Sequence, residues 1–131
     1  MSPATSFARD KTAILRTVDR YATGLRGHIK QLERAFRPRA IVFGYIGKTP
    51  YFDSISQLRD YVRQHASPRE KFDPFRYRVT SLKVSGQTAT VQLNETAYLD
   101  VDYETSLQLM KIKGKWLIVS KLFSGRPLPK L

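Results

Sequence analysis

Hydrophobic positions recur with a helical spacing in the first half of the chain and with a two-residue alternation in the second half. From Asp10 onward, the helical spacing predicts a first helix with one apolar face, made of Ile14, Val18, Tyr21, Ala22 and Leu25. Gly27 ends this helix, because glycine readily adopts the left-handed conformation that follows a last helical turn. A short second helix is predicted before Pro38, with a buried stripe of Ile29, Leu32, Ala35 and Phe36.

A first strand and a third helix follow. Residues 40–43 are apolar and predict a strand, and residues 44–53, with two glycines and one proline, predict a loop or a hairpin. Ser54 and Gln57 have the spacing of a capping box, in which each side chain accepts a hydrogen bond from the other residue's backbone N–H. They predict the start of a third helix, whose apolar face holds Ile55, Leu58, Tyr61 and Val62.

The second half of the chain predicts strands and no further helix. After a polar connector, apolar residues alternate over Arg76–Val84, Thr88–Tyr98, Tyr103–Ile112 and Lys115–Phe123, with tight turns at residues 85–87 and 113–115. Helices followed by an antiparallel meander predict an α+β fold. Without a repeat or a linker, we expect one domain over residues 1–131, with residues 1–8 disordered and residues 125–131 as an extended tail.

The last predicted strand is apolar on both faces. Strict alternation places Trp116, Ile118 and Leu122 on one face, and Leu117, Val119 and Phe123 on the other. The helices can cover only one of these faces. We therefore expect a homodimer that buries the face bearing Leu117, Val119 and Phe123, with Lys115 and Lys121 framing the interface.

The chain carries an excess of positive charge, since 23 lysine and arginine residues stand against 11 acidic residues, a formal net charge of +12. Such a balance favours association with anions. The basic residues are spread along the chain rather than gathered in a stripe, which favours a solvated cationic surface over specific nucleic-acid binding. A non-catalytic cationic module that binds an acidic protein or nucleic acid is the alternative interpretation.

Composition narrows the remaining classes of function. The absence of cysteine removes disulfides, thiolate metal sites and cysteine nucleophiles, and two histidines cannot form a histidine-rich metal site alone. We therefore expect no metal and no cofactor. No segment has the roughly 20 apolar residues of a membrane span, and the N-terminal residues lack the apolar run of a secretory signal. The expectation is a cytoplasmic protein that does not contact a membrane.

Four segments carry a resemblance to a known fold: TVDRYATGLRGH (17–28), FRPRAIVFG (36–44), SISQLRDYV (54–62) and LQLMKIKGKWLIVSKLF (107–123). Their order resembles the nuclear transport factor 2-like superfamily over about residues 10–125, and within it the lumazine-binding subfamily and its polyketide-cyclase-like (SnoaL-like) relatives. The resemblance implies a cone of three N-terminal helices packed on a curved antiparallel sheet. It also implies a pocket on the concave face and dimers through the outer face. The same cone hosts isomerases, cyclases, dehydratases and plain binding proteins, so the resemblance leaves open whether a reaction is catalysed.

The chain departs from the family pattern at acidic positions. The subfamily often has acidic residues where this chain has His28 and Arg39, and an acidic–aromatic pair near residues 105–106, whereas Asp102-Tyr103 stands three residues earlier. Tyr21 lies in a segment similar to the first helix of the ketosteroid isomerases, where a tyrosine stabilises an oxyanion. The position that matches their general-base aspartate is Gly44, which has no side chain to accept a proton.

Aromatic residues provide the candidate ligand site, because pockets lined by aromatic side chains with few polar groups are the usual small-molecule sites. We predict that Tyr21 and Trp116 line one pocket for a small apolar, aromatic or polycyclic ligand, although core packing would use the same residues. The predicted ligand-binding residues are Tyr21, Phe36, Phe43, Tyr61, Tyr98, Asp102 and Trp116. An isomerase-, cyclase- or dehydratase-like activity of the pocket stays open.

Three polar residues have two interpretations each, and a fourth has one. Asp100 and Asp102 share a strand face and could act as an acid–base pair, or form a solvated strand edge. His28 could be a pocket base or a capping residue, and Asp53 is expected to cap the third helix.

Overall fold

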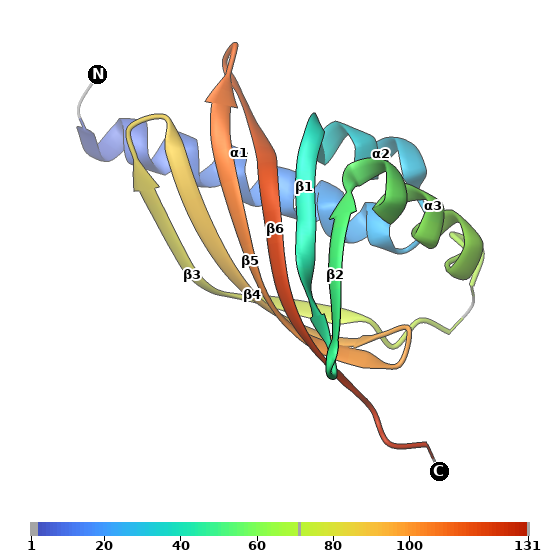
Figure 1. Cartoon of the computed structure of the whole chain (residues 1–131). Coiled ribbons are helices and arrows are strands. Elements are labelled where there is room, and N and C mark those ends of the chain that lie inside the picture. The colour runs from blue at the N-terminus through green and yellow to red at the C-terminus, as the bar shows by residue number, and fades with distance from the viewer. Residues whose placement is uncertain (1–2, 71, 131) are drawn as a thin grey trace.

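The computed structural model describes residues 3–70 and 72–130, which form three helices and one six-stranded sheet (Figure 1). The helices are α1 (Pro3–Leu25), α2 (Ile29–Ala35) and α3 (Ile55–His65). The strands are β1 (Phe36–Ile46), β2 (Thr49–Ser54), β3 (Arg76–Ser85), β4 (Thr88–Tyr98), β5 (Val101–Ile112) and β6 (Lys115–Pro127).

The strand order in the sheet is β2-β1-β6-β5-β4-β3. Strands β3 to β6 form the predicted antiparallel meander, and β1 and β2 form a hairpin. The first and last strands pair in parallel, so the expectation of a wholly antiparallel sheet is wrong at this pair. The third helix also follows β2 rather than preceding the sheet, so two helices, not three, are N-terminal.

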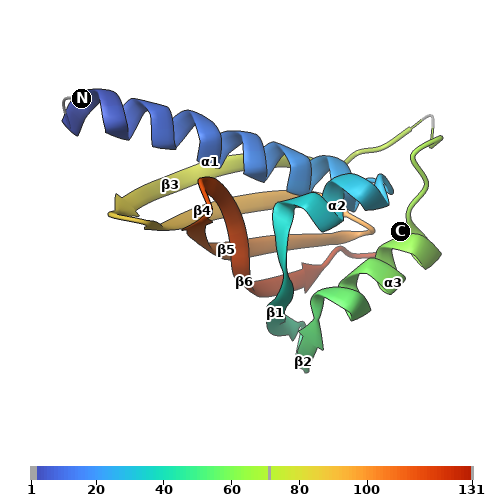
Figure 2. The ribbon, with the colours of Figure 1, turned by 90° about the horizontal axis from the view of Figure 1, so that it is seen from above.

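The helices cover one face of the curved sheet. In Figure 2, α1 lies over the meander, while α3 lies beside the β1–β2 hairpin. The five apolar residues predicted for the first helix are all buried in this layer, as are Ile55, Leu58 and Val62 of α3. Ser54 caps α3 and shares the predicted capping box with Gln57. No helix within the described ranges is long and apolar enough to cross a membrane.

Three local expectations are corrected by the structure. Residues 3–8 belong to α1 and are not disordered, while residues 1–2 lie outside the described residues. Phe36 begins β1 instead of ending α2, and Pro38 lies inside that strand. The expected tail is partly sheet, because β6 continues to Pro127.

A bulge in β6 reverses the facing of its second half. Leu109 pairs with Ile118, but its neighbour Gln108 pairs with Ser120, so Val119 is an extra residue. An extra residue shifts a two-residue alternation by one position. Lys121 and Phe123 consequently face the helices and are buried, whereas Leu122 faces outward and is 49% exposed. The predicted facings of these three residues are therefore wrong.

Candidate functional site

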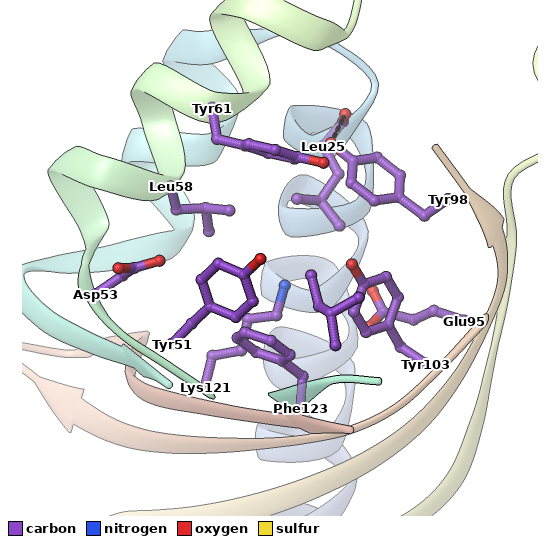
Figure 3. Close-up of a pocket in the computed structure, with 11 residues that line it drawn as sticks. Leu25, Tyr51, Asp53, Leu58, Tyr61, Glu95, Tyr98, Tyr103, Lys121 and Phe123 are labelled. Carbon is purple, nitrogen blue, oxygen red and sulfur yellow. Dashed lines mark hydrogen bonds between the residues drawn. The ribbon is translucent and has the colours of Figure 1, made fainter. Parts of the chain in front are cut away.

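A cavity of about 130 Å³ lies between the helices and the inner face of the sheet (Figure 3). Residues from α1, α3 and every strand except β3 form its wall: Leu25, Ile46, Tyr51, Asp53, Leu58, Tyr61, Glu95, Tyr98, Tyr103, Lys121 and Phe123. Most of this wall is aromatic or aliphatic. Its charged members are Asp53, Glu95 and Lys121.

Glu95 is a buried acid on the inner face of β4. It continues the inward series of Ala89, Val91 and Leu93 and is 2% exposed. Its Oε2 accepts a hydrogen bond from the Tyr21 hydroxyl at 2.7 Å, and its Oε1 accepts one from Thr105. Both oxygens are thus held in place, and as a carboxylate each still has a free lone pair.

Tyr21 lies behind the cavity wall and orients Glu95. The side chain is fully buried, and its ring packs edge-to-face against Phe36 at a centroid distance of 5.9 Å. Burial, followed by the charge of Glu95, raises the pKa of Tyr21 well above its usual value. The phenol therefore stays protonated and donates to Glu95. Because this donor is already used, the structure does not support the oxyanion-stabilising role implied by the ketosteroid isomerase resemblance.

Lys121 is brought into the cavity by the bulge at Val119. Its Nζ lies 5.0 Å from the centroid of the Tyr21 ring and 5.5 Å from that of Phe123. Nζ finds no hydrogen-bond or ion-pair partner among residues 3–70 and 72–130. Burial lowers the pKa of Lys121, and the charge of Glu95 partly opposes this shift. Figure 3 shows the amine pointing between Tyr51 and Tyr103 into the middle of the cavity.

Tyrosines form much of the remaining wall. Tyr98 donates its hydroxyl to the Leu25 carbonyl at 2.7 Å, and Tyr103 packs edge-to-face on Phe123 at 5.7 Å. Burial is the main cause that raises the pKa of both tyrosines. The hydroxyl of Tyr61, on the inner side of α3, faces the cavity from above in Figure 3. The cavity therefore combines aromatic surfaces and phenol groups with two acids, Asp53 and Glu95, and one amine.

The residues predicted to bind a ligand do not gather in one place. Tyr61 and Tyr98 line the cavity, while Tyr21 and Phe36 pack behind its wall. Phe43 borders a hollow on the outer face of the sheet.

Trp116 and Asp102 lie away from the cavity. The Trp116 indole donates to Asp10 at 3.2 Å, so the prediction that Trp116 shares one pocket with Tyr21 is wrong. Asp102 accepts from the backbone N–H of Ala97 at 2.8 Å and pairs with Arg126 at 3.1 Å. These contacts brace the β4–β5 connection.

The structure also shows where the other candidate positions, His28, Asp53 and Gly44, lie. His28 is exposed at the start of α2 and makes no capping hydrogen bond through its side chain. Asp53 lines the cavity, and the residue that caps α3 is Ser54, so the expectation that Asp53 caps this helix is wrong. At Gly44, an added Cβ would collide with the Phe123 carbonyl oxygen, so this position cannot carry a base. No cluster suited to a metal ion occurs in the described part of the chain.

Neither Glu95 nor Lys121 was predicted from the sequence as a cavity residue, for different reasons. A signal for Glu95 existed, since it falls in register with the buried residues of a regularly alternating strand. Lys121 had no such signal, because the bulge that turns it inward depends on pairing with β5. Alternation alone places it on the outside.

Glu95 and Lys121 both lie in the region of the chain that matches a known protein family. A sequence model of the family described as "Putative lumazine-binding" matches residues 9–124. The chain is also similar to the aldolase FrzH of Cladobotryum sp., with 29% identity over 121 residues, which is 88% of this chain and 90% of that protein.

Solved structures share the architecture. A nuclear transport factor 2-like protein of unknown function from Silicibacter pomeroyi DSS-3 matches with a TM-score of 0.80 and 22% identity, over 96% of this chain and 100% of that chain. A second such protein, from Shewanella baltica OS155, matches with a TM-score of 0.79 and 21% identity, over 92% of this chain and 97% of that chain. These likenesses show the fold.

Proposed function

The chain belongs to the "Putative lumazine-binding" family of the nuclear transport factor 2-like superfamily, and from this premise we propose that it binds a small carbonyl compound and catalyses proton transfer at the adjacent carbon. Reactions of this type start aldol, isomerisation and cyclisation chemistry. The aldolase name of the similar protein from Cladobotryum sp. supports the aldol branch.

One observation carries the proposal: an acid and an amine line the same apolar cavity without forming an ion pair with each other. Glu95 can accept a proton from the carbon next to a carbonyl, because its carboxylate is oriented by Tyr21 and Thr105. The amine of Lys121, which points into the same cavity, can donate a hydrogen bond to the enolate oxygen that then develops. In an apolar enclosure such interactions are stronger than in water.

The cavity limits the size of the ligand. Its volume of about 130 Å³ is close to that of an engineered cavity of roughly 150 Å³ that binds benzene. One ring with a short carbonyl-bearing chain is therefore the core that fits, and the tyrosine rings suit an aromatic one. A larger substrate would extend past the cavity mouth.

Hydrogen exchange on a model ketone tests the proposal. Phenylacetone in heavy water should lose its benzylic proton signals faster with the protein than without it, as followed by proton NMR. Glu95→Gln should reduce this catalysed rate by about 10²–10⁴-fold, the usual contribution of a general base. Glu104→Gln, on the exposed side of neighbouring β5, is the matched control and should keep the full rate. An equal rate with and without protein would refute the proposal.

One observation, a groove lined by basic residues, supports the alternative function of a cationic module that binds an acidic protein or nucleic acid. Arg16, Arg20, Arg34 and Lys115 border a single groove that has no acidic residue in its lining, and none of them forms an ion pair with the described residues. Binding to nucleic acid there would rest on phosphate contacts and fall steeply with salt. Submicromolar binding that survives ~200 mM salt would favour this second function over the first.

A further inference from the structure

The environment of Lys121 is unusual for a structural lysine. Lysine is almost never fully buried unless it is paired, yet Lys121 is 7% exposed and has no polar partner among the described side chains. Its contacts are the faces of Tyr21 and Phe123. Removing an ammonium from water costs free energy and so favours the neutral amine, while the nearby charge of Glu95 partly opposes this effect.

We propose that Lys121 is a nucleophile that forms a Schiff base with the carbonyl carbon of a ketone or aldehyde bound in the cavity. This inference rests on the proposed function and assigns the way in which the same cavity activates its substrate. The geometry supports it, because the amine stands in the middle of the cavity and Glu95 lies on the adjoining wall (Figure 3). Lysines desolvated in apolar pockets are the ones that proteins use for this chemistry.

The steps balance without any external oxidant or reductant. The Nζ lone pair attacks the carbonyl carbon, and proton transfer from nitrogen to oxygen gives a neutral carbinolamine. The carbinolamine then takes up one proton from solvent and loses water to give a protonated imine. Glu95 then removes a proton from the neighbouring carbon, and the C–H electron pair moves to form an enamine. The enamine carbon attacks an acceptor aldehyde, whose oxygen takes the proton from Glu95, and the nitrogen becomes a protonated imine again. Water finally hydrolyses this imine, which restores the free amine and returns one proton to solvent.

The protonation state of Lys121 agrees with this role. Only the neutral amine is a nucleophile, and burial lowers the pKa of Lys121, so the neutral form appears at a lower pH than for an exposed lysine. The titratable groups around the cavity that face the amine are Tyr21, Tyr51, Asp53, Tyr61, Glu95, Tyr98 and Tyr103. The phenols stay neutral near neutral pH where burial raises their pKa, as it does for Tyr21, Tyr98 and Tyr103.

Reductive trapping tests the inference. The protein is incubated with phenylacetone and cyanoborohydride near neutral pH, and its mass is then measured. One adduct should form, with a mass gain equal to phenylacetone less one oxygen atom, because water leaves and reduction adds two hydrogens. Trypsin should no longer cleave after Lys121, since a bulky secondary amine blocks that site. Trapping should increase as pH rises through the lowered pKa of Lys121.

Two variants of Lys121 and one control variant make the test specific. Lys121→Met removes the amine at similar volume and should abolish the adduct and reduce phenylacetone exchange at least about tenfold. Lys121→Arg keeps a positive charge and should be equally inactive in trapping. Lys83→Met, which removes an exposed lysine of β3, should behave as the unmodified chain. Circular dichroism checks that each variant is folded. If a variant does not fold, mapping of the adduct on the unmodified chain still decides the test.

The outcomes separate this inference from the proposed function. Exchange without an adduct at Lys121, or full exchange by Lys121→Met, would overturn the Schiff base while leaving carbonyl chemistry at Glu95 intact. Adducts confined to exposed lysines would overturn it equally. The absence of both exchange and adduct would refute the proposed function and the inference together.

Discussion

At the scale of single residues, the site depends on how Glu95 is held. Its two oxygens accept hydrogen bonds from Tyr21 on α1 and Thr105 on β5, so a helix and two strands fix one carboxylate. Tyr21 therefore positions Glu95, and its removal should also lower the free energy of unfolding.

Replacement of Tyr21 by phenylalanine should lower the free energy of unfolding by about 1.5–3 kcal/mol, the range for buried hydrogen bonds to charged groups. Tyr77→Phe is the matched control, because the Tyr77 hydroxyl donates to Asp19 at 3.3 Å on the exposed surface. The loss of this bond should lower the free energy of unfolding by less than about 0.5 kcal/mol. Urea unfolding measures both. Equal losses for the two variants would show that the bond between Tyr21 and Glu95 is not the cause.

Alkaline pH should destabilise the fold through its buried tyrosines. Burial raises the pKa of Tyr21, Tyr98 and Tyr103, so the stability they contribute is complete below the unfolded value of about 10 and is lost as pH rises towards the folded values. Lys121 acts with the opposite sign, since its lowered pKa makes the fold more stable as pH rises, but it is a single group.

Tyrosinate absorbance and far-UV circular dichroism, recorded through one pH titration, check this expectation. The last tyrosines to ionise should do so together with the loss of secondary structure. Ionisation of all seven tyrosines while the fold is intact would contradict it.

At the scale of elements, periodicity predicted what depends on local sequence. The helical spacing identified the buried stripe of α1, and the alternation over Thr88–Tyr98 matched β4 in its bounds. It failed in β6, because the bulge at Val119 reverses every later side chain. The parallel pairing of β1 with β6 also escaped prediction, since no local pattern encodes contact between strands so far apart in sequence.

Trp116 belongs to the unreversed half of β6 and acts there as a core residue. It is 3% exposed, and its carbonyl accepts from Thr17 at 2.8 Å. Trp116→Ala should therefore cost about 3–5 kcal/mol, as for other large aromatic core deletions. Phe72→Ala, at a side chain that is 77% exposed, should cost less than about 0.5 kcal/mol. Thermal or urea unfolding measures the difference, and a small loss at Trp116 would argue against its place in the core.

At the scale of the whole molecule, the outer face of the sheet carries an uncovered apolar row. Phe43 of β1 pairs with Phe52 of β2 on one side and with Leu122 of β6 on the other. Phe52 and Leu122 are 83% and 49% exposed. We propose that a second copy of the chain covers this row. Phe123, which was expected at that interface, faces the cavity instead.

Light scattering at tens of micromolar should give the mass of a dimer. Leu122→Glu should shift it towards the monomer, because a charge would be buried in the interface. Lys83→Glu, an exposed change on β3 at the far edge of the sheet, should leave the dimer intact. A monomeric unmodified chain would contradict this assembly.

We propose that a small carbonyl compound binds and reacts in the cavity around Glu95 and Lys121. A crystal structure of the protein grown with phenylacetone and treated with cyanoborohydride tests it most directly. We expect electron density for the ring among the tyrosines, continuous with Lys121 Nζ, with the benzylic carbon beside Glu95. An empty cavity, with the compound absent or bound only on the outer face of the sheet, would contradict it.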